Sequence, residues 1–206
     1  QFLSDILERD ATNRDSSHDF GKDLIPGLIG EARMYAHRFQ NSAVALDTTT
    51  GEPYWRDVGT LDAYWESNLD LTNVVPALDL YDAEWPIWTY HRQLPAAKFV
   101  FDSNERRGMA VDSVVSAGCI ISGGTVRRSA LFSNVRVNSF STVEDSVVLS
   151  NTDIGRHARL EKVIVDENCR IPTGLVVGEN PEEDARRFHR TEKGIVLITQ
   201  EMLDAL

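Results

Sequence analysis

The chain has 206 residues, of which 42% are hydrophobic, so it is long enough to bury a core in one large domain or two small ones. Its 32 acidic residues outnumber its 21 lysines and arginines, and the formal charge of −11 argues against general nucleic-acid binding, because a duplex repels an acidic surface. No run of about 18 apolar residues and no signal peptide is visible, so we expect a soluble cytoplasmic domain without a membrane span. Two cysteines, Cys119 and Cys169, are too few for a disulfide framework and are expected to be reduced core residues.

The first part of the chain mixes helical and extended patterns. It begins at Gln1 rather than at a methionine, with a charged helix-like stretch, so we expect a piece of a longer protein. A second helix is expected over residues 20–29, with Pro26 early in it or bending it. Residues 32–44 alternate loosely between two faces, which indicates strands.

A further helix is expected after residue 60. Thr60 is a suitable N-cap, and residues 61–71 carry an apolar stripe at helical spacing. Pro76, Pro86 and Pro95 then interrupt an aromatic-rich stretch, which indicates an extended connector.

From about Val111 onward the helical pattern stops, and aliphatic residues recur every 17 positions in three interleaved columns. The columns are Val114, Leu131, Val148 and Val165; Ile120, Val137, Ile154 and Ile171; and Val126, Val143, Leu160 and Val177. A period of 17 split into three parts gives one short strand and one turn on each side of a triangular coil. A single coil leaves its aliphatic residues exposed, whereas stacked coils bury each column continuously. The pattern therefore predicts a hexapeptide-repeat parallel β-helix.

The repeat ends after Gly178. Residues 181–184 combine a proline with acidic side chains, as at the start of a helix, while residues 195–198 indicate a strand and residues 200–206 a short helix. We expect this C-terminal segment to cap the open end of the β-helix, which otherwise exposes unpaired strand edges.

Four segments of the chain carry a family resemblance. They are residues 53–61, which read Pro-Tyr-Trp-Arg-Asp-Val-Gly-Thr-Leu, and residues 16–23, 95–100 and 178–188. In content, order and spacing these segments resemble the ADP-glucose pyrophosphorylases (glucose-1-phosphate adenylyltransferases) of the proteobacterial type, over essentially the whole chain. The resemblance implies the C-terminal end of an α/β nucleotidyltransferase domain plus a connector over residues 1–107. It also implies a β-helix domain, typically left-handed in proteins with such repeats, with a C-terminal cap over residues 108–206.

The resemblance also implies an activity. Enzymes of this family use Mg²⁺ to make ADP-glucose and pyrophosphate from ATP and glucose 1-phosphate in glycogen synthesis, form homotetramers and respond to phosphorylated metabolites. Their glycine-rich nucleotide loop and their Glu-Lys pair for the sugar phosphate are not found in this sequence, so we expect the isolated chain to be inactive. The glycines Gly123 and Gly124 do not replace that loop, because they lie inside the repeat beside Val126 of an aliphatic column.

Asp57 is the candidate catalytic residue and metal ligand. Adenylyl transfer requires aligned reactants and compensation of the phosphate charge, which Mg²⁺ supplies when one or two carboxylates hold it. Asp57 fits such a carboxylate, since the nearby Gly59 lets the backbone approach a ligand closely. The resemblance implies the same role, shared with a second Asp outside this chain; the alternative is that Asp57 only forms a turn or a helix cap. Arg56 is a candidate for binding a substrate phosphate or for a structural salt bridge, and Trp55 is expected in the core.

A serine, a histidine and an aspartate also occur together in residues 16–19. Adjacent residues rarely face one another, so His18 and Asp19 are not expected to form a catalytic triad. We expect instead a helix-start box that holds Phe20 in the core.

Basic residues gather near the C-terminus of this acidic chain. They are Arg186, Arg187, Arg190 and Lys193. Phosphorylated effectors favour arginine clusters, so these four residues are candidates for effector binding. The alternative is a solvated helix face paired with the acidic residues 182–184. The last seven residues hold no lysine or arginine, unlike those of enteric members, so we expect regulation to differ or basic residues to follow the end of this chain.

Two other functions stay open. Hexapeptide acyltransferases share the β-helix and need a catalytic histidine, for which His157 is the candidate, although residues 54–60 have no place in that function. A non-catalytic regulatory or assembly subunit would use the flat faces of the β-helix for contacts between subunits.

Overall fold

The computed structural model describes residues 1–41, 46–103 and 106–206. Contacts divide the chain into two compact units, Gln1–Ser42 and Ala43–Leu206. Within the described residues, no helix is long and apolar enough to cross a membrane.

The first unit is helical. It contains α1 (Phe2–Ala11), the π-helical turn η1 (Phe20–Leu24), α2 (Ile25–Leu28) and the 3-10 turn η2 (Phe39–Asn41). Ile6, Leu24 and Leu28 form its buried cluster. The expected first helix is confirmed, and the helix expected over residues 20–29 forms as η1 followed by α2. Pro26 lies in the first turn of α2, where its missing N–H breaks no hydrogen bond.

The prediction of strands over residues 32–44 is wrong for the described part of that range. The described residues 33–41 form no strand, and residues 42–44 of that prediction lie outside the described residues. Loose alternation alone does not make a strand, because its backbone groups still need a neighbouring strand to bond.

The helix-start box of this unit forms, but its aromatic residue is not in the core. The Asp19 carboxylate caps η1 by accepting hydrogen bonds from two backbone N–H groups. Phe20 is nevertheless 51% exposed, so the expected core position is wrong. The cluster of Ile6, Leu24 and Leu28 fills the small interior that a unit of this size can form.

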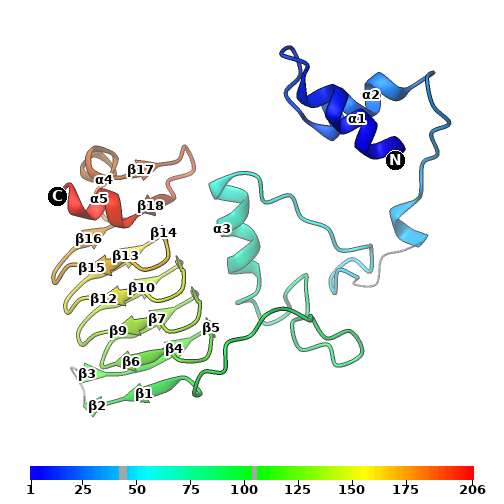
Figure 1. The fold of residues 1–206 in the computed structure, drawn as a ribbon. Helices are drawn as coiled ribbons and strands as arrows, with labels where there is room; N and C mark the ends of the chain where they lie inside the picture. Colours follow the sequence, from blue (N-terminus) through cyan, green and yellow to red (C-terminus); the bar gives the residue numbers. More distant parts are fainter. Residues whose placement is uncertain (42–45, 104–105) are drawn as a thin grey trace. The chain divides into compact units, whose positions relative to one another are not determined.

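The second unit is dominated by the predicted parallel β-helix, whose coils are seen stacked in Figure 1 and whose strands form three main sheets. One sheet contains β1 (Lys98–Val100), β6 (Ile120–Ser122), β9 (Arg136–Val137), β12 (Asp153–Ile154) and β15 (Arg170–Ile171). A second contains β4 (Met109–Val111), β7 (Thr125–Arg127), β10 (Thr142–Glu144), β13 (Arg159–Glu161) and β16 (Val176–Val177). The third contains β5 (Val114–Val115), β8 (Ala130–Leu131), β11 (Val147–Val148), β14 (Val163–Val165), β18 (Val196–Ile198) and the antiparallel β17 (His189–Arg190). A short antiparallel pair, β2 (Asp102–Ser103) and β3 (Arg106–Arg107), lies beside the first coil.

The strand register confirms ten of the twelve predicted column positions and corrects two. Leu131 pairs with Val115 rather than Val114, and Val137 pairs with Ile121 rather than Ile120. The cause is a shorter turn in the first coil. One residue separates Ile121 from the corner glycine at 123, whereas two separate Val137 from the corner residue at 140. A strict count of 17 therefore selects the preceding aliphatic residue.

Every corner of the β-helix uses a backbone in the left-handed region. The corner residues are Gly118, Asn134, Asn151 and Asn168; Gly123, Phe140, His157 and Gly174; and Asp112, Arg128, Asp145 and Lys162. Asparagine adopts this conformation more readily than most residues. At its corner the amides also bond from coil to coil, with Asn134 Nδ2 to Asn151 Oδ1 and Asn151 Nδ2 to Asn168 Oδ1 both 3.1 Å.

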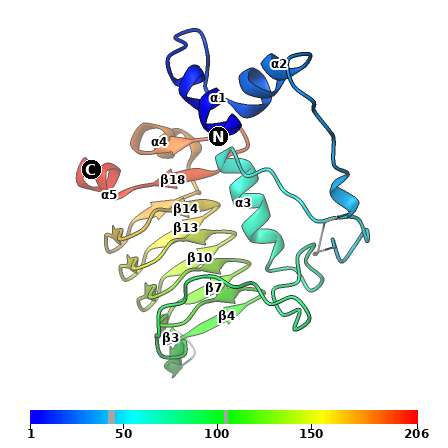
Figure 2. The ribbon, with the colours of Figure 1, turned by 45° about the vertical axis from the view of Figure 1, so that its right-hand side comes forward.

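The C-terminal segment caps the β-helix as expected. It forms α4 (Pro181–Arg187), β17, β18 and α5 (Gln200–Asp204), seen at one end of the stack in Figure 2. β18 pairs in parallel with β14, while Phe188 and Leu203 enter the same buried cluster as Val196. The last strand edge of the third sheet is thereby covered. Both cysteines are free and buried in this cluster, which confirms that prediction.

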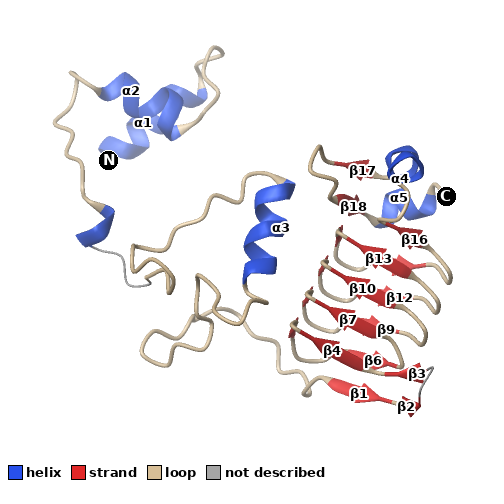
Figure 3. Cartoon of the chain, turned by 180° about the vertical axis from the view of Figure 1, so that it is seen from behind, coloured by secondary structure: helices blue, strands red, loops and turns tan. Residues whose placement is uncertain are grey.

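The predicted helix at residue 61 is confirmed as α3 (Leu61–Asp70) and lies against the β-helix (Figure 3). Thr60 caps it, since its hydroxyl accepts the Ala63 N–H at 3.2 Å. Trp65 packs over Val147 and Ile164, and its indole N–H donates to the Asp145 carbonyl at 2.7 Å. The β-helix therefore fixes the chain that immediately follows the candidate site.

Candidate functional site

Asp57 lies in an exposed turn just before α3. Its Oδ1 accepts the Gly59 N–H at 2.9 Å, and a side chain at position 59 would approach that oxygen to 3.1 Å. Asp57 thus forms a turn, and this bond alone does not distinguish a metal ligand from a residue that only forms a turn. Within the described residues Oδ2 makes no hydrogen bond, so one carboxylate oxygen stays available to a ligand.

A hairpin precedes this turn, and Arg56 follows the hairpin. Leu46 and Pro53 form its bridge, and the Asp47 carboxylate accepts bonds from the Thr49 side chain and from backbone N–H groups in its loop. These bonds, first of all the one from Thr49, lower the pKa of Asp47, and the nearby positive charge of Arg56 contributes. Arg56 is exposed and lies near both Asp47 and Tyr54, so it can be reached by a phosphate.

The expectation that Trp55 lies in the core is wrong for this chain. Its side chain is 69% exposed, and Val58 is 48% exposed. Residues 54–59 belong to no strand or helix, and residues 55–59 are all exposed.

The residues around Asp57 suit one metal ligand and not a complete metal site. No group of three or more histidine, cysteine, aspartate or glutamate side chains that could hold a metal occurs in residues 1–41, 46–103 and 106–206. Mg²⁺ commonly needs only one or two protein carboxylates, since substrate phosphates and waters supply the other oxygens. The exposed Asp57 fits as one of those carboxylates.

The four basic residues near the C-terminus differ in their surroundings. Arg187 is held by the Asp184 carboxylate at 3.1 Å, the Val176 carbonyl at 2.8 Å and the Glu183 carboxylate at 3.3 Å. Lys193 bonds Glu66 at 2.7 Å, and this contact raises the pKa of the lysine. These two residues are therefore partly neutralised by acidic partners.

The other two members of the cluster are open to solvent. Arg186 is exposed and donates from Nε to the Glu182 carbonyl at 3.2 Å, and Arg190 is exposed on β17. The alternative to effector binding was a helix face paired with acidic residues. That description fits Arg187, but the guanidinium groups of Arg186 and Arg190 stay exposed.

The two candidate histidines make contacts that suit structural roles. His157 occupies a corner of the β-helix with φ 58°, and its ring stacks on Phe140 with centroids 4.9 Å apart. His18 Nδ1 lies 2.8 Å from Asp10, and Ser16 bonds the other oxygen of the same carboxylate. These bonds, first the one from Ser16, lower the pKa of Asp10. Ser16 Oγ accepts the backbone N–H of His18 at 3.0 Å, while the His18 ring bonds Asp10 and not the serine hydroxyl, which is not the arrangement of a triad.

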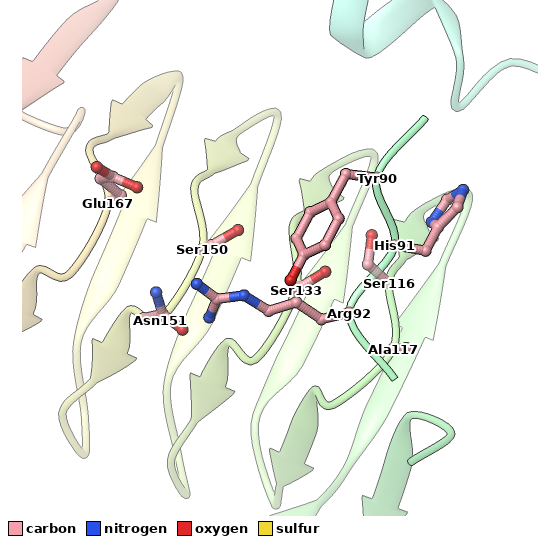
Figure 4. Close-up of a pocket in the computed structure, with 9 residues that line it drawn as sticks. All are labelled: Tyr90, His91, Arg92, Ser116, Ala117, Ser133, Ser150, Asn151 and Glu167. Carbon is pink, nitrogen blue, oxygen red and sulfur yellow. The ribbon is translucent and has the colours of Figure 1, made fainter. Parts of the chain in front are cut away.

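One pocket was not predicted from the sequence. It has a volume of about 510 Å³ and lies where the connector crosses a corner of the β-helix (Figure 4). Its lining residues are Tyr90, His91, Arg92, Ser116, Ala117, Ser133, Ser150, Asn151 and Glu167. The Arg92 side chain extends along the coils toward Asn151. The recurrence of serine at 116, 133 and 150 was a usable signal, because small residues at a corner leave room for a groove.

Comparison with known families matches two adjacent parts of the chain. Residues 1–74 match the nucleotidyl transferase family, and residues 95–198, half of the chain, match the family described as GlmU-like, C-terminal hexapeptide. The chain belongs to the GlmU-like hexapeptide family. The predicted fold class, a nucleotidyltransferase segment followed by a hexapeptide β-helix, is confirmed.

Curated relatives carry the resemblance further. The glucose-1-phosphate adenylyltransferases of Paramagnetospirillum magneticum and Rhodospirillum rubrum are each 63% identical over 206 and 205 residues, which cover 100% of this chain and 48% of theirs. The enzyme of Nitrosospira multiformis is 61% identical over 202 residues, 98% of this chain and 47% of its own. The chain spans about half the length of these relatives and corresponds to their C-terminal half. The predicted resemblance to the proteobacterial adenylyltransferases is confirmed.

Proposed function

We propose that this chain is the C-terminal part of a cytoplasmic glucose-1-phosphate adenylyltransferase, which makes ADP-glucose and pyrophosphate from ATP and glucose 1-phosphate for glycogen synthesis. The observation that carries the proposal is 63% identity over the full chain to enzymes of that name. The two matched modules, in the same order, support it.

Within this reaction Asp57 supplies one carboxylate for Mg²⁺. Mg²⁺ would offset the charge on the reacting phosphates and align them. The free Oδ2 of Asp57 and the lack of a side chain at Gly59 support this role. A second carboxylate would come from outside this chain, and Arg56, exposed one residue away, would bind a substrate phosphate.

The β-helix supplies assembly and regulation in this proposal. Its flat sheets would contact other subunits of a homotetramer, and phosphorylated metabolites would bind at the basic residues near the C-terminus. The exposure of Arg186 and Arg190 supports them as the main effector contacts. Arg187 and Lys193 would contribute less, since acidic partners already hold them.

An assay of pyrophosphate release tests the proposal. The full-length protein that carries this chain is given glucose 1-phosphate, Mg²⁺ and either ATP or UTP, and the isolated 206-residue chain serves as the control. Release with ATP by the full-length protein alone is expected. Release with UTP instead contradicts the nucleotide, and no release with either favours the regulatory subunit.

A further inference from the structure

The candidate metal ligand and α3 are connected by very little chain. Asp57 is three residues before Thr60, the N-cap of α3. Its carboxylate bonds the Gly59 N–H at 2.9 Å, and the Thr60 hydroxyl bonds the Ala63 N–H at 3.2 Å. A shift of the first turn of α3 must therefore move the Asp57 carboxylate.

A threonine of the C-terminal cap makes a polar contact with that first turn. The Thr191 hydroxyl donates to Asp62 Oδ1 at 2.6 Å, across 129 positions of sequence. The same hydroxyl accepts the Ile195 N–H at 3.1 Å, so the loop between β17 and β18 fixes its direction. The bond to Asp62 is partly buried and ends on a charged group, which makes it stronger than a neutral exposed bond.

Apolar packing also holds α3 against the β-helix, and it includes Leu61, the first residue of the helix. Trp65 bonds the Asp145 carbonyl at 2.7 Å and packs on the β-helix. Glu66 pairs with Lys193 at 2.7 Å, but the two side chains are 53% and 63% exposed, so this ion pair constrains α3 weakly. Among the described residues, Asp62 makes the polar side-chain contact between the first turn of α3 and the cap.

We propose that Thr191 and Asp62 are positioning residues for Asp57. The inference rests on the proposed function, in which Asp57 holds Mg²⁺. The contact joins the stretch that matches nucleotidyl transferases to the stretch that matches the hexapeptide family. Through the bond between Thr191 and Asp62, the C-terminal cap fixes the position of the first turn of α3 and thereby the position of the Asp57 carboxylate. Misplacement of a ligand by a fraction of an ångström weakens a site, so loss of this bond lowers the affinity for Mg²⁺.

Kinetics of the full-length enzyme test the proposal. Thr191→Val removes the hydroxyl at nearly constant volume, Thr191→Ser keeps it, and Thr173→Val is the matched control at an exposed corner of the β-helix. Thr191→Val is expected to raise the half-saturating Mg²⁺ concentration by about three- to tenfold, the range that loss of one hydrogen bond to a charged group gives after partial transmission. Thr191→Ser is expected to restore the wild-type value, with an unchanged KM for glucose 1-phosphate in all three variants.

Hydrogen exchange supplies a second measurement that does not depend on activity. In the metal-free full-length protein, the Gly59 and Ala63 amides are expected to exchange several-fold faster in Thr191→Val than in Thr173→Val. Asp62→Ala removes the other partner of the bond and is expected to give the same two effects, which covers the case in which Thr191→Val fails to fold.

The outcomes separate the two proposals. An active wild-type enzyme in which Thr191→Val and Asp62→Ala match Thr173→Val, both in Mg²⁺ dependence and in exchange, overturns the positioning role alone. A lower melting temperature with neither change also overturns it, because a purely structural contact gives that result. A wild-type protein that releases no pyrophosphate overturns the proposed function and this inference together.

Discussion

The β-helix and the segment that precedes it differ in how their apolar side chains are covered. Each coil of the β-helix is covered by the next, so that Val148 and Ile154 are 0% exposed within the chain itself. Before the β-helix, Trp55, Val74 and Trp88 are 69%, 95% and 91% exposed. Because its coils repeat, the β-helix buries its own apolar side chains without another part of the protein. The exposed side chains of the preceding segment agree with the proposal that about half of the enzyme, the half that completes the site, lies outside this chain.

The largest effect expected from this comparison is loss of the β-helix when a column is interrupted. Val148→Asp places an unpaired carboxylate in the buried column, and we expect it to destabilise the fold by about 4 kcal/mol or more. The measurement is urea unfolding of the 206-residue chain. Val111→Asp, at a position 38% exposed on β4, is the control and is expected to change stability little. Equal unfolding curves for the two variants would contradict the column register.

The next effect should appear in activity and not in stability. Asp57→Asn keeps the shape of the turn but removes the charge, and we expect the kcat of the full-length enzyme to fall by about 100-fold or more. Asp82→Asn is a matched control, because Asp82 also accepts the N–H two residues ahead, at 2.8 Å, in an exposed turn. Melting temperatures of both variants should stay close to that of the wild type. Similar kcat values in the two variants would remove Asp57 from the metal site.

The stability of the β-helix should also depend on pH, because its core buries two thiol groups. Burial raises the pKa of the Cys169 thiol to about 11, and burial also raises the pKa of Cys119. A raised pKa favours the protonated thiol in the folded state, so its contribution to stability is complete at neutral pH and is lost as the pH rises from about 9 toward 11. We expect the free energy of unfolding to fall over that range in the wild type and to fall less in Cys169→Ala.

A thiol reagent gives an independent measurement of the same burial. At pH 8 neither cysteine of the folded chain should react, and both should react after unfolding. Rapid labelling of the native chain would show that the β-helix core opens under these conditions.

The smallest expected effect concerns the exposed ion pair of α3. Glu66→Gln removes its partner charge from Lys193, but both side chains are more than half exposed. We expect the melting temperature to change by less than about 1 °C, because solvent already screens such a pair. A drop of several degrees in thermal melts would mean that α3 docks mainly through this pair rather than through Trp65 and the apolar face around it.

The sequence predicted the β-helix well because its information is local and repeated. The two register errors arose where either of two adjacent aliphatic residues, Val114 or Val115 and Ile120 or Ile121, satisfies the pattern. Only the length of the turn before Gly123 shows which residue of each pair belongs to the column. That turn is one residue shorter than in the other coils, so a constant spacing of 17 selects the wrong residue.

The candidate site was predicted less completely. The motif at residues 54–60 placed Asp57 beside a turn and Thr60 at a helix cap, both as found. Burial of Trp55 was wrong, because it depends on neighbours rather than on the residue itself. The contact of Thr191 with Asp62 spans 129 positions and follows no periodicity, so only the folded chain reveals it.

The central claim is tested most directly by the reverse reaction. The full-length protein is incubated with Mg²⁺, pyrophosphate and either ADP-glucose or UDP-glucose, and the nucleoside triphosphate formed is measured. We predict ATP from ADP-glucose, no UTP from UDP-glucose, and loss of the ATP signal in Asp57→Asn. Formation of UTP, or no triphosphate from either sugar nucleotide, would contradict the adenylyltransferase proposal and leave the β-helix fold unaffected.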